Sequence, residues 1–383
     1  MLNHREILLH NHQKIFEWVK YKNDVIPEAI NTLYSSVDVR EASFKIAPVD
    51  INLFPGGFNN FSLDKDITCL ISLFKNKISK FAPKTIGLVV ENFTRNKHYL
   101  DNVDVLKRAL ESLCDRVFLL TVDTESLKVV SFQDGPKVEL EELDLIVLNN
   151  DLTIGCPDDL LRLKNRVVPS PEFGWYKRRK ATHLRLYNEL ILEMIQDLNL
   201  DIDPWSLTTF IDTCEGVDFK SKIGITELSE KVHIVLKQIE DKYKQQKITE
   251  HLPHVFIKPN SGTFGMGIMV AYSADDILKI NKNQRDSMHL LKQGAHNNSV
   301  IIQEGVQTFL KFHGIPCENV LYGFDMEVLG RLVRFNSRKS NEQSLNSMGM
   351  EIKLADNFDI VDRIVSNISN LAVKLEGNIL NTN

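Results

Sequence analysis

The sequence predicts a mixed α/β protein in which a parallel sheet is followed by antiparallel α+β lobes. Continuous apolar runs at 84–90, 117–122 and 143–148, with a helical stretch between the first two, are typical of buried strands in a βαβ unit. Farther along, a glycine-rich loop at 258–268 joins two apolar runs, and such a loop indicates a hairpin. We expect an N-terminal helical and substrate-binding segment, an α/β domain and an α+β domain, at 1–80, 81–172 and 173–383.

The composition limits which partners the protein can have. With 43% apolar and 25% charged residues, the chain resembles an ordinary globular protein. Its net charge of −5 gives no general attraction to nucleic acid or anionic membrane, and no apolar run approaches the length of a membrane span. The first residues lack a secretory pattern, and the five cysteines are scattered without a C-x-x-C pair. We expect a cytoplasmic protein without nucleic-acid or membrane partners, and its oligomeric state stays open.

Residues 1–34 have the apolar spacing of helices, and the next segment, 37–60, mixes charges, amides and aromatic rings. Pro48 and Pro55 interrupt its short alternations and should limit any regular element there. The polar side chains suit a pocket for a small zwitterion, with cations for carboxylates and a carboxylate for an ammonium group. The candidate substrate-binding residues here are Arg40, Lys45, Asp50, Asn52, Asn59 and Asn60. The alternative interpretation is a well-capped surface loop.

Polar residues also follow the predicted strands of the α/β domain. Arg95 comes after the first strand and Asn150 after the third, and ligands of open α/β sheets gather outside the carboxyl ends of strands. Polar residues in these places also commonly do no more than start turns. A basic run at 177–180 follows, in which Arg178 and Arg179 could grip phosphate or carboxylate groups. Such a run is equally typical of a solvated helix start or a weak nucleic-acid patch.

The stretch 254–270 carries the strongest chemical signal. Lys258 ends an apolar run, and the loop behind it supplies three glycines and two small hydroxyl residues. The backbone N–H groups of such a loop form a concavity for phosphate oxygens, which the lysine can also reach. The residues assigned to this site are Lys258, Ser261, Gly262, Thr263, Gly265 and Gly267. A P-loop has its lysine after the glycines and a dinucleotide fingerprint opens a helix, so the remaining alternative is a plain hairpin.

Two later segments complete a candidate nucleotide site. The run at 298–306 ends in polar backbone that can pair with an adenine edge, through Gln303, Glu304 and Val306. A hairpin at 320–336 places Arg334 and Asn336 on one face, because they are two residues apart. Glu342 and Asn346, which follow it, offer the oxygen ligands that Mg²⁺ uses together with phosphates. Amphipathic helices are predicted at 184–198, 228–243 and 357–377.

These motifs, in this order, resemble those of the ATP-grasp ligases, and the closer match is to the proteobacterial-type glutamate–cysteine ligases. The phrases that carry the resemblance lie at 50–60, 91–96, 148–152, 174–180, 258–268 and 303–306. The resemblance implies an ATP-grasp-like fold, in which 81–172 precedes the ATP-grasp-like domain at 173–383. It also implies that ATP and Mg²⁺ drive the formation of γ-glutamylcysteine from L-glutamate and L-cysteine through a γ-glutamyl phosphate, the first step of glutathione biosynthesis.

The resemblance assigns roles to individual residues as well. Lys258 and the loop at 261–267 would bind the phosphates of ATP, and residues 303–306 would lie at its adenine. Arg334 and Asn336 would face the phosphoryl group and the metal.

One part of the family pattern is not found where it is expected. Many ATP-grasp enzymes carry their metal ligands on a late strand, as an acidic residue followed by Glu-x-Asn, and no such strand precedes Asn383. Glu342 and Asn346 are the expected substitutes. The alternatives are the same ligase chemistry with another amino acid pair, and a nucleotide-binding regulatory module without catalysis.

Overall fold

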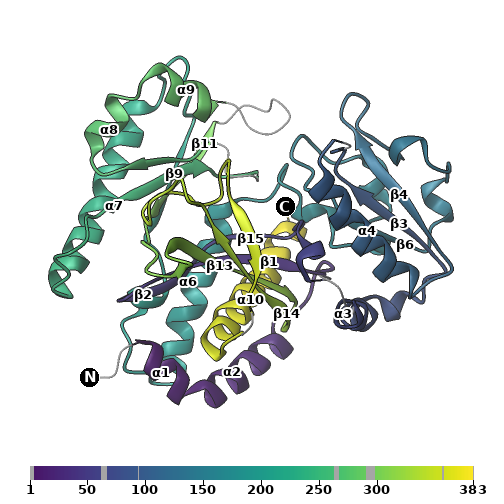
Figure 1. The fold of residues 1–383 in the computed structure, drawn as a ribbon, viewed down its shortest axis with the longest axis horizontal. Helices are drawn as coiled ribbons and strands as arrows, with labels where there is room; N and C mark the ends of the chain where they lie inside the picture. The colour runs from purple at the N-terminus through teal and green to yellow at the C-terminus, as the bar shows by residue number, and fades with distance from the viewer. Residues whose placement is uncertain are drawn as a thin grey trace.

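The computed structural model describes residues 4–61, 67–93, 95–262, 267–289, 298–355 and 358–382. Its strands form three sheets, and Figure 1 shows one of them lying between the other two. The fold is therefore mixed α/β, as the apolar runs predict. No helix in these ranges is long and apolar enough to cross a membrane.

The middle sheet is antiparallel and brings together the two ends of the chain. Its order is β15–β14–β13–β1–β2, with the short β12 paired to β13. The strands are β1 (Ser35–Ala42), β2 (Lys45–Asn52), β12 (Lys311–Phe312), β13 (Ile315–Phe324), β14 (Glu327–Phe335) and β15 (Glu351–Leu354). The N-terminal hairpin thus continues a sheet whose other strands come late in the sequence. The proposed division at 80 and 172 stays a prediction, and this sheet draws strands from both sides of it.

Helices cover one face of the middle sheet. Helix α10 (Ile360–Thr382) packs its apolar side on Val37, Val39 and Leu321, which are all fully buried. Three further helices surround α10 in Figure 1: α1 (His4–His10), α2 (His12–Val25) and α6 (Lys180–Asp197). These four helices do not cover the opposite face of the middle sheet.

The second sheet has the predicted βαβ organisation. Its order is β5–β4–β3–β6–β7, and only β5 runs antiparallel to its neighbour. The strands are β3 (Thr85–Val90), β4 (Arg116–Asp123), β5 (Lys128–Ser131), β6 (Leu145–Asn149) and β7 (Val167–Val168). The helices of this part are α3 (Thr68–Ile78), α4 (Lys97–Glu111) and α5 (Asp158–Arg162). Helix α4 begins after Asn96, whose side chain accepts from the Tyr99 backbone N–H.

The third sheet contains the predicted glycine-loop hairpin. Its order is β10–β9–β11–β8, all antiparallel. The strands are β8 (Ile211–Glu215), β9 (Val255–Pro259), β10 (Met269–Ala271) and β11 (Ser299–Glu304). The amphipathic helix α7 (Ile225–Gln245) packs on one face, with α8 (Ala274–Leu278) and α9 (Lys282–His289) beside it. Short 3₁₀ helices lie at Phe58–Phe61, Ser79–Phe81, Phe132–Asp134, Leu140–Glu142, Lys164–Arg166, Pro171–Phe173 and Pro204–Leu207.

The segment 37–60 is more regular than its prolines predict. Pro48 lies inside β2, where the expectation of an interrupted segment is wrong. The strand tolerates it because β2 is the edge of the sheet and the pairing register shifts beside Pro48. The later hairpin is also tighter than predicted, since β13 and β14 are separated only by Asp325 and Met326.

Candidate functional site

Alternation along β1 and β2 creates a charged face on the side of the middle sheet away from α10. Val37, Val39 and Ile51 point into the core under α10, so the residues between them point the other way. Asp38 on β1 lies directly opposite Asp50 on β2. Two carboxylates on neighbouring strands therefore share this face, which we call the charged face and define by Asp38, Arg40, Asp50, Glu318 and Arg334.

The two arginines of the charged face bind its carboxylates. Arg334 donates to Asp38 from Nη1 (2.5 Å to Oδ2) and Nη2 (3.1 Å to Oδ1). Its Nη1 also donates to Glu318 Oε1 at 2.9 Å, and Arg40 donates from Nε to Glu318 Oε2 at 2.7 Å. The four side chains form one continuous network, and all of them are at most 14% exposed.

Burial and ion pairing act against each other in this network. Burial raises the pKa of Asp38 above its ordinary value, and Arg334 offsets this only in part. Burial also acts to raise the pKa of Glu318, but Arg40 and Arg334 outweigh it and hold that pKa below its ordinary value. Although burial acts to lower the pKa of Arg334, Asp38 and Glu318 raise it, so this guanidinium stays charged. The face therefore presents fixed charges where water screens them poorly.

Two lysines from other elements reach the Asp50 end of the charged face. Lys180, the first residue of α6, donates to both carboxylate oxygens of Asp50 at 2.7 Å. Lys258, on β9, donates to the Val49 carbonyl at 2.7 Å. Burial acts to raise the pKa of Asp50, but Lys180 and then Lys258 lower it below its ordinary value. Burial lowers the pKa of Lys258 itself to about 8.

Asn260 fixes the relative positions of these two lysines. Its carbonyl accepts from the Lys180 backbone N–H at 2.7 Å, and its Oδ1 accepts from the Ala181 N–H at 3.0 Å. Because Asn260 lies two residues after Lys258, the end of β9 is attached to the first turn of α6. The backbone carbonyl and the side chain of Asn260 thus each accept from an N–H group that a helix start leaves unpaired.

Comparison with known proteins identifies the family. The family model described as glutamate-cysteine ligase matches residues 5–363. The chain belongs to the glutamate–cysteine ligase family. A crystal structure of a protein assigned as a gamma-glutamylcysteine synthetase, from Methylobacillus flagellatus KT, is 31% identical to this chain. That match has a TM-score of 0.80 and covers 97% of this chain and 94% of that one.

More distant matches add nothing to this assignment. D-cycloserine synthetase DcsG is 12% identical with a TM-score of 0.40, over 76% of this chain and 82% of that one. D-alanyl-alanine synthetase A from Vibrio cholerae O1 biovar eltor is 12% identical with a TM-score of 0.37, over 78% and 81%. A search of curated protein sequences gave no match. Membership of the glutamate–cysteine ligase family makes the chain an ATP-dependent ligase that forms γ-glutamylcysteine.

The glycine-rich loop of this ligase lies beside Lys258. Gly262 and Gly267 have φ of +91° and +63°, a region that favours glycine, and Ser261 is half-buried. Thr263 and Gly265 lie outside the described residues. The assignment of this loop to phosphates stays a prediction.

The end of β11 makes internal contacts. Glu304 accepts from Lys45 Nζ at 2.7 Å, from Trp205 Nε1 at 3.0 Å and from the Phe210 N–H at 2.9 Å. Lys45 also lies over the Trp205 ring, and burial lowers its pKa to about 8. Lys45, which the sequence assigns to a substrate pocket, is thus paired with Glu304 and not with Asp50.

The other adenine candidates lie close by. Gln303 is buried, and its Nε2 donates to the Thr209 hydroxyl at 3.2 Å. The Val306 carbonyl accepts from Arg40 Nη1 at 3.2 Å, which links this strand end to the charged face. Arg40 also lies over the Phe256 ring, 5.5 Å from its centroid.

The arginines of the basic run have structural partners. Arg178 donates from Nε and Nη2 to the two Glu376 oxygens, at 2.9 and 3.1 Å, and from Nη1 to the Ile51 carbonyl at 3.0 Å. Both side chains of this ion pair are 1% exposed. Arg179 donates to the carbonyls of Trp175 and Arg178. The structure therefore uses Arg178 to hold the backbone between Asp50 and Asn52.

Most of the predicted amide ligands have partners within their own loops. Asn52 Oδ1 accepts from the Phe54 N–H at 3.0 Å, and Asn60 Nδ2 donates to the Gly57 carbonyl at 2.8 Å. Asn150 Oδ1 accepts from the Leu152 N–H at 3.0 Å, and its Nδ2 donates to the Val90 carbonyl, on a neighbouring strand, at 3.1 Å. Asn59 lies in the 3₁₀ helix at Phe58–Phe61, and Arg95 is exposed. These contacts fit the capped-loop alternative for Asn60 and the turn alternative for Asn150, and the assignment of both residues to a substrate stays a prediction.

The expected metal ligands after β14 lie in one loop, and their assignment to a metal stays a prediction. Glu342 accepts from the Tyr272 hydroxyl at 2.8 Å and from Gln307 Nε2 at 2.7 Å. Asn346 is half-buried in the same loop, and Asn336 donates to the Ser347 hydroxyl at 3.2 Å. Among the described residues, no three His, Cys, Asp or Glu side chains cluster closely enough to hold a metal.

Sequence reasoning missed three residues of this region: Asp38, Glu318 and Lys180. A signal exists for the neighbouring strand, since Asp50-Ile51-Asn52 is similar to the Glu-x-Asn pattern sought on a late strand, with Asp in place of Glu. The structure pairs β2, which bears Asp50 and Asn52, with β1, which bears Asp38 and lies next to β13. Two carboxylates and one amide oxygen fit Mg²⁺, which commonly takes one or two carboxylates together with phosphate oxygens.

Proposed function

We propose that this ligase phosphorylates the γ-carboxylate of L-glutamate with ATP on the charged face and then joins the product to the amine of L-cysteine. The observation that carries the proposal is the convergence of Lys258 with the Asp38–Asp50 pair. Lys258 comes from the strand before the glycine-rich loop, and the carboxylates come from a different sheet. Such a convergence between two antiparallel sheets supports an ATP-grasp-like arrangement, with the nucleotide between them.

Lys258 is the proposed partner of the transferred phosphoryl group. A pKa of about 8 leaves its ammonium mostly protonated at pH 7, and a bound phosphate would raise that pKa. Arg334 is the second proposed partner, because its guanidinium is permanently charged and already held in a fixed orientation. Phosphoryl transfer depends on such positioned cations more than on a protein nucleophile.

Asp38, Asp50 and Asn52 are the proposed holders of Mg²⁺, in place of Glu342 and Asn346. The metal would supply positive charge that offsets the negative charge of the phosphates. Lys180 and Lys258 favour the ionised form of Asp50, which is the form that binds a cation. Lys180 and Arg334 would then exchange part of their contact with these carboxylates for contact with phosphate.

The proposed reaction has two steps. An oxygen of the glutamate γ-carboxylate bonds to the γ-phosphorus of ATP while the bond between that phosphorus and ADP breaks. The cysteine nitrogen then bonds to the acyl carbon and loses a proton, and inorganic phosphate leaves with one former carboxylate oxygen. Water must be kept from the acyl phosphate between the steps, and the glycine-rich loop is the proposed barrier.

Phosphate release from ATP and Mg²⁺ tests the substrate assignment. The purified protein is assayed with glutamate plus cysteine, with each alone, and with a panel of other amines. We expect release only with the pair, and γ-glutamylcysteine as the product. Release with a different pair would keep the chemistry and overturn the substrates, and nucleotide binding without any release would favour a regulatory module.

A further inference from the structure

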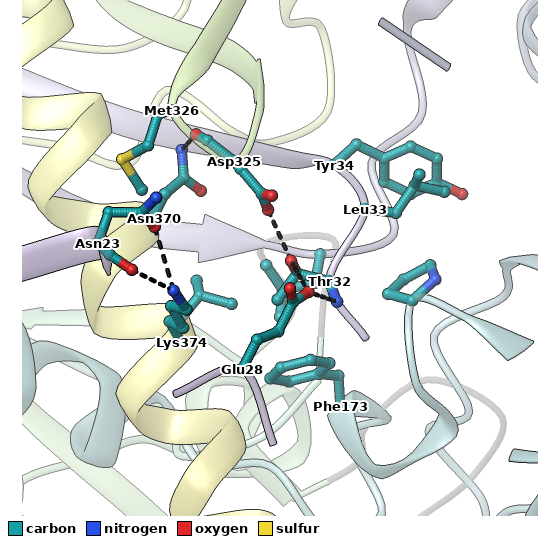
Figure 2. Close-up of a pocket in the computed structure, with 13 residues that line it drawn as sticks. Asn23, Glu28, Thr32, Leu33, Tyr34, Phe173, Asp325, Met326, Asn370 and Lys374 are labelled. Carbon is teal, nitrogen blue, oxygen red and sulfur yellow. Dashed lines mark hydrogen bonds between the residues drawn. The ribbon is translucent and has the colours of Figure 1, made fainter. Parts of the chain in front are cut away.

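A cavity of about 90 Å³ lies on the far side of β2 from the charged face, and within the described chain the two share no residue. Its walls come from the segment before β1, the β13–β14 turn, helix α10 and Leu53, the residue after β2. Figure 2 shows Lys374 on one side of this space and Glu28 with Thr32 on the other. Leu33, Leu53, Phe173 and Met326 supply apolar surface between these polar ends.

One end of the cavity has more acceptors than donors. The Thr32 hydroxyl lies 2.9 Å from Glu28 Oε1 and 2.6 Å from Asp325 Oδ1. A hydroxyl has one hydrogen, so it can donate to only one of these carboxylates. Asp325 has an ion pair with Lys77 through its other oxygen. Glu28 Oε1 also accepts from the Thr32 backbone N–H at 3.0 Å, which leaves the hydroxyl for Asp325. An ammonium group entering here would donate to the second carboxylate oxygen of Glu28, Oε2.

The opposite end has a spare donor. The Lys374 ammonium donates to the carbonyl of Asn23 at 2.5 Å and to its Oδ1 at 3.3 Å. An ammonium has three hydrogens, and both of these acceptors are uncharged. Within the described chain, no ion pair links Lys374 to a carboxylate. A ligand carboxylate would therefore gain a charge-assisted hydrogen bond at this end.

We propose that this cavity binds a small α-amino acid, with its ammonium at Glu28 and Asp325 and its carboxylate at Lys374. A water needs about 10–15 Å³ of cavity volume of this kind, so the space holds roughly six to nine waters and has room for a small amino acid such as glycine. The site is separate from the reaction on the charged face. Its occupant would brace the end of β2, where Asn52 precedes Leu53, against α10.

Thermal unfolding with glycine as the probe tests the site. Glycine also stabilises proteins weakly by exclusion from their surface, so glycine betaine, which lacks N–H donors, is the matched solute. We expect glycine to raise the melting temperature saturably and betaine to raise it only linearly. Equal, linear effects of the two solutes would overturn the proposal.

Four variants locate the effect. Lys374→Met and Glu28→Gln should each raise the half-saturating glycine concentration at least about tenfold. Glu28 is exposed, so its variant keeps the test valid if Lys374→Met fails to fold. Lys20→Met, an exposed change on α2, and Lys258→Met, beside the charged face, should leave glycine binding unchanged. Binding that survives Lys374→Met and Glu28→Gln, or is lost in Lys258→Met, would contradict the proposal.

Discussion

Replacing Lys258 with methionine removes an ammonium group that the folded chain buries between two sheets. Burial lowers its pKa from 10.5 to about 8. At about 1.4 kcal/mol for each tenfold change in acidity, the charged form costs the folded state about 3 kcal/mol at pH 7. The variant also loses the hydrogen bond to the Val49 carbonyl, which is worth about 1 kcal/mol. We therefore expect Lys258→Met to be about 2 kcal/mol more stable than the wild type at pH 7, and inactive.

The sign of the pH dependence follows from the same shift. Between pH 8 and 10.5 the unfolded chain binds more protons at this lysine than the folded chain does, so wild-type stability rises with pH through that window. The Lys258→Met variant lacks this rise in stability, because methionine does not titrate. The advantage of the variant should therefore shrink as pH increases from 8 and vanish by about pH 10.5.

Urea unfolding followed by tryptophan fluorescence, at pH 7 and pH 10, measures both effects. Lys353→Met is the control, because Lys353 is exposed on β15 and its loss should change little at either pH. A Lys258→Met protein that is less stable than wild type at pH 7, or whose stability difference is the same at both pH values, would refute the reasoning.

Two further predictions concern residues around Asp50. Asp50→Asn and Asp38→Asn should each raise the Mg²⁺ concentration for half-maximal activity at least about tenfold, because each removes a proposed metal ligand. The control Asp275→Asn, at an exposed position, should leave that concentration unchanged. An unchanged Mg²⁺ requirement in both Asp50→Asn and Asp38→Asn would rule out this ligand set. Glu376→Gln should lower the unfolding free energy in urea by about 3 kcal/mol or more, because it leaves the buried Arg178 guanidinium without a counter-charge. Combining it with Arg178→Met should recover much of that loss, and a single variant as stable as wild type would contradict the role of the pair.

The parts of the fold that sequence patterns predict are those in which neighbours along the chain determine the structure. The strands β3 and β6 are buried on both faces and β4 is buried or half-buried beyond Arg116, so their apolar runs are continuous and easily recognised. The glycine-loop hairpin and helices α6 and α7 follow from spacing in the same way. These local patterns do not determine which strands pair.

The charged face depends on pairing between distant segments, so sequence spacing could not assemble it. Asp38 meets Arg334 because β1 pairs with β13, and nothing near Asp38 in the sequence indicates that pairing. Lys180 reaches Asp50 only because α6 starts beside the end of β9. Arg178 resembles a ligand-binding arginine in sequence, and only the structure reveals Glu376 as its partner.

The central claim is that ATP activates glutamate as an acyl phosphate on the charged face. Glutamate labelled with ¹⁸O in its γ-carboxylate tests it most directly, in a reaction with ATP, Mg²⁺ and cysteine. The account predicts that each inorganic phosphate released carries one ¹⁸O atom, since the oxygen that bonds to phosphorus leaves with it. Unlabelled phosphate, or label found in AMP, would contradict the account.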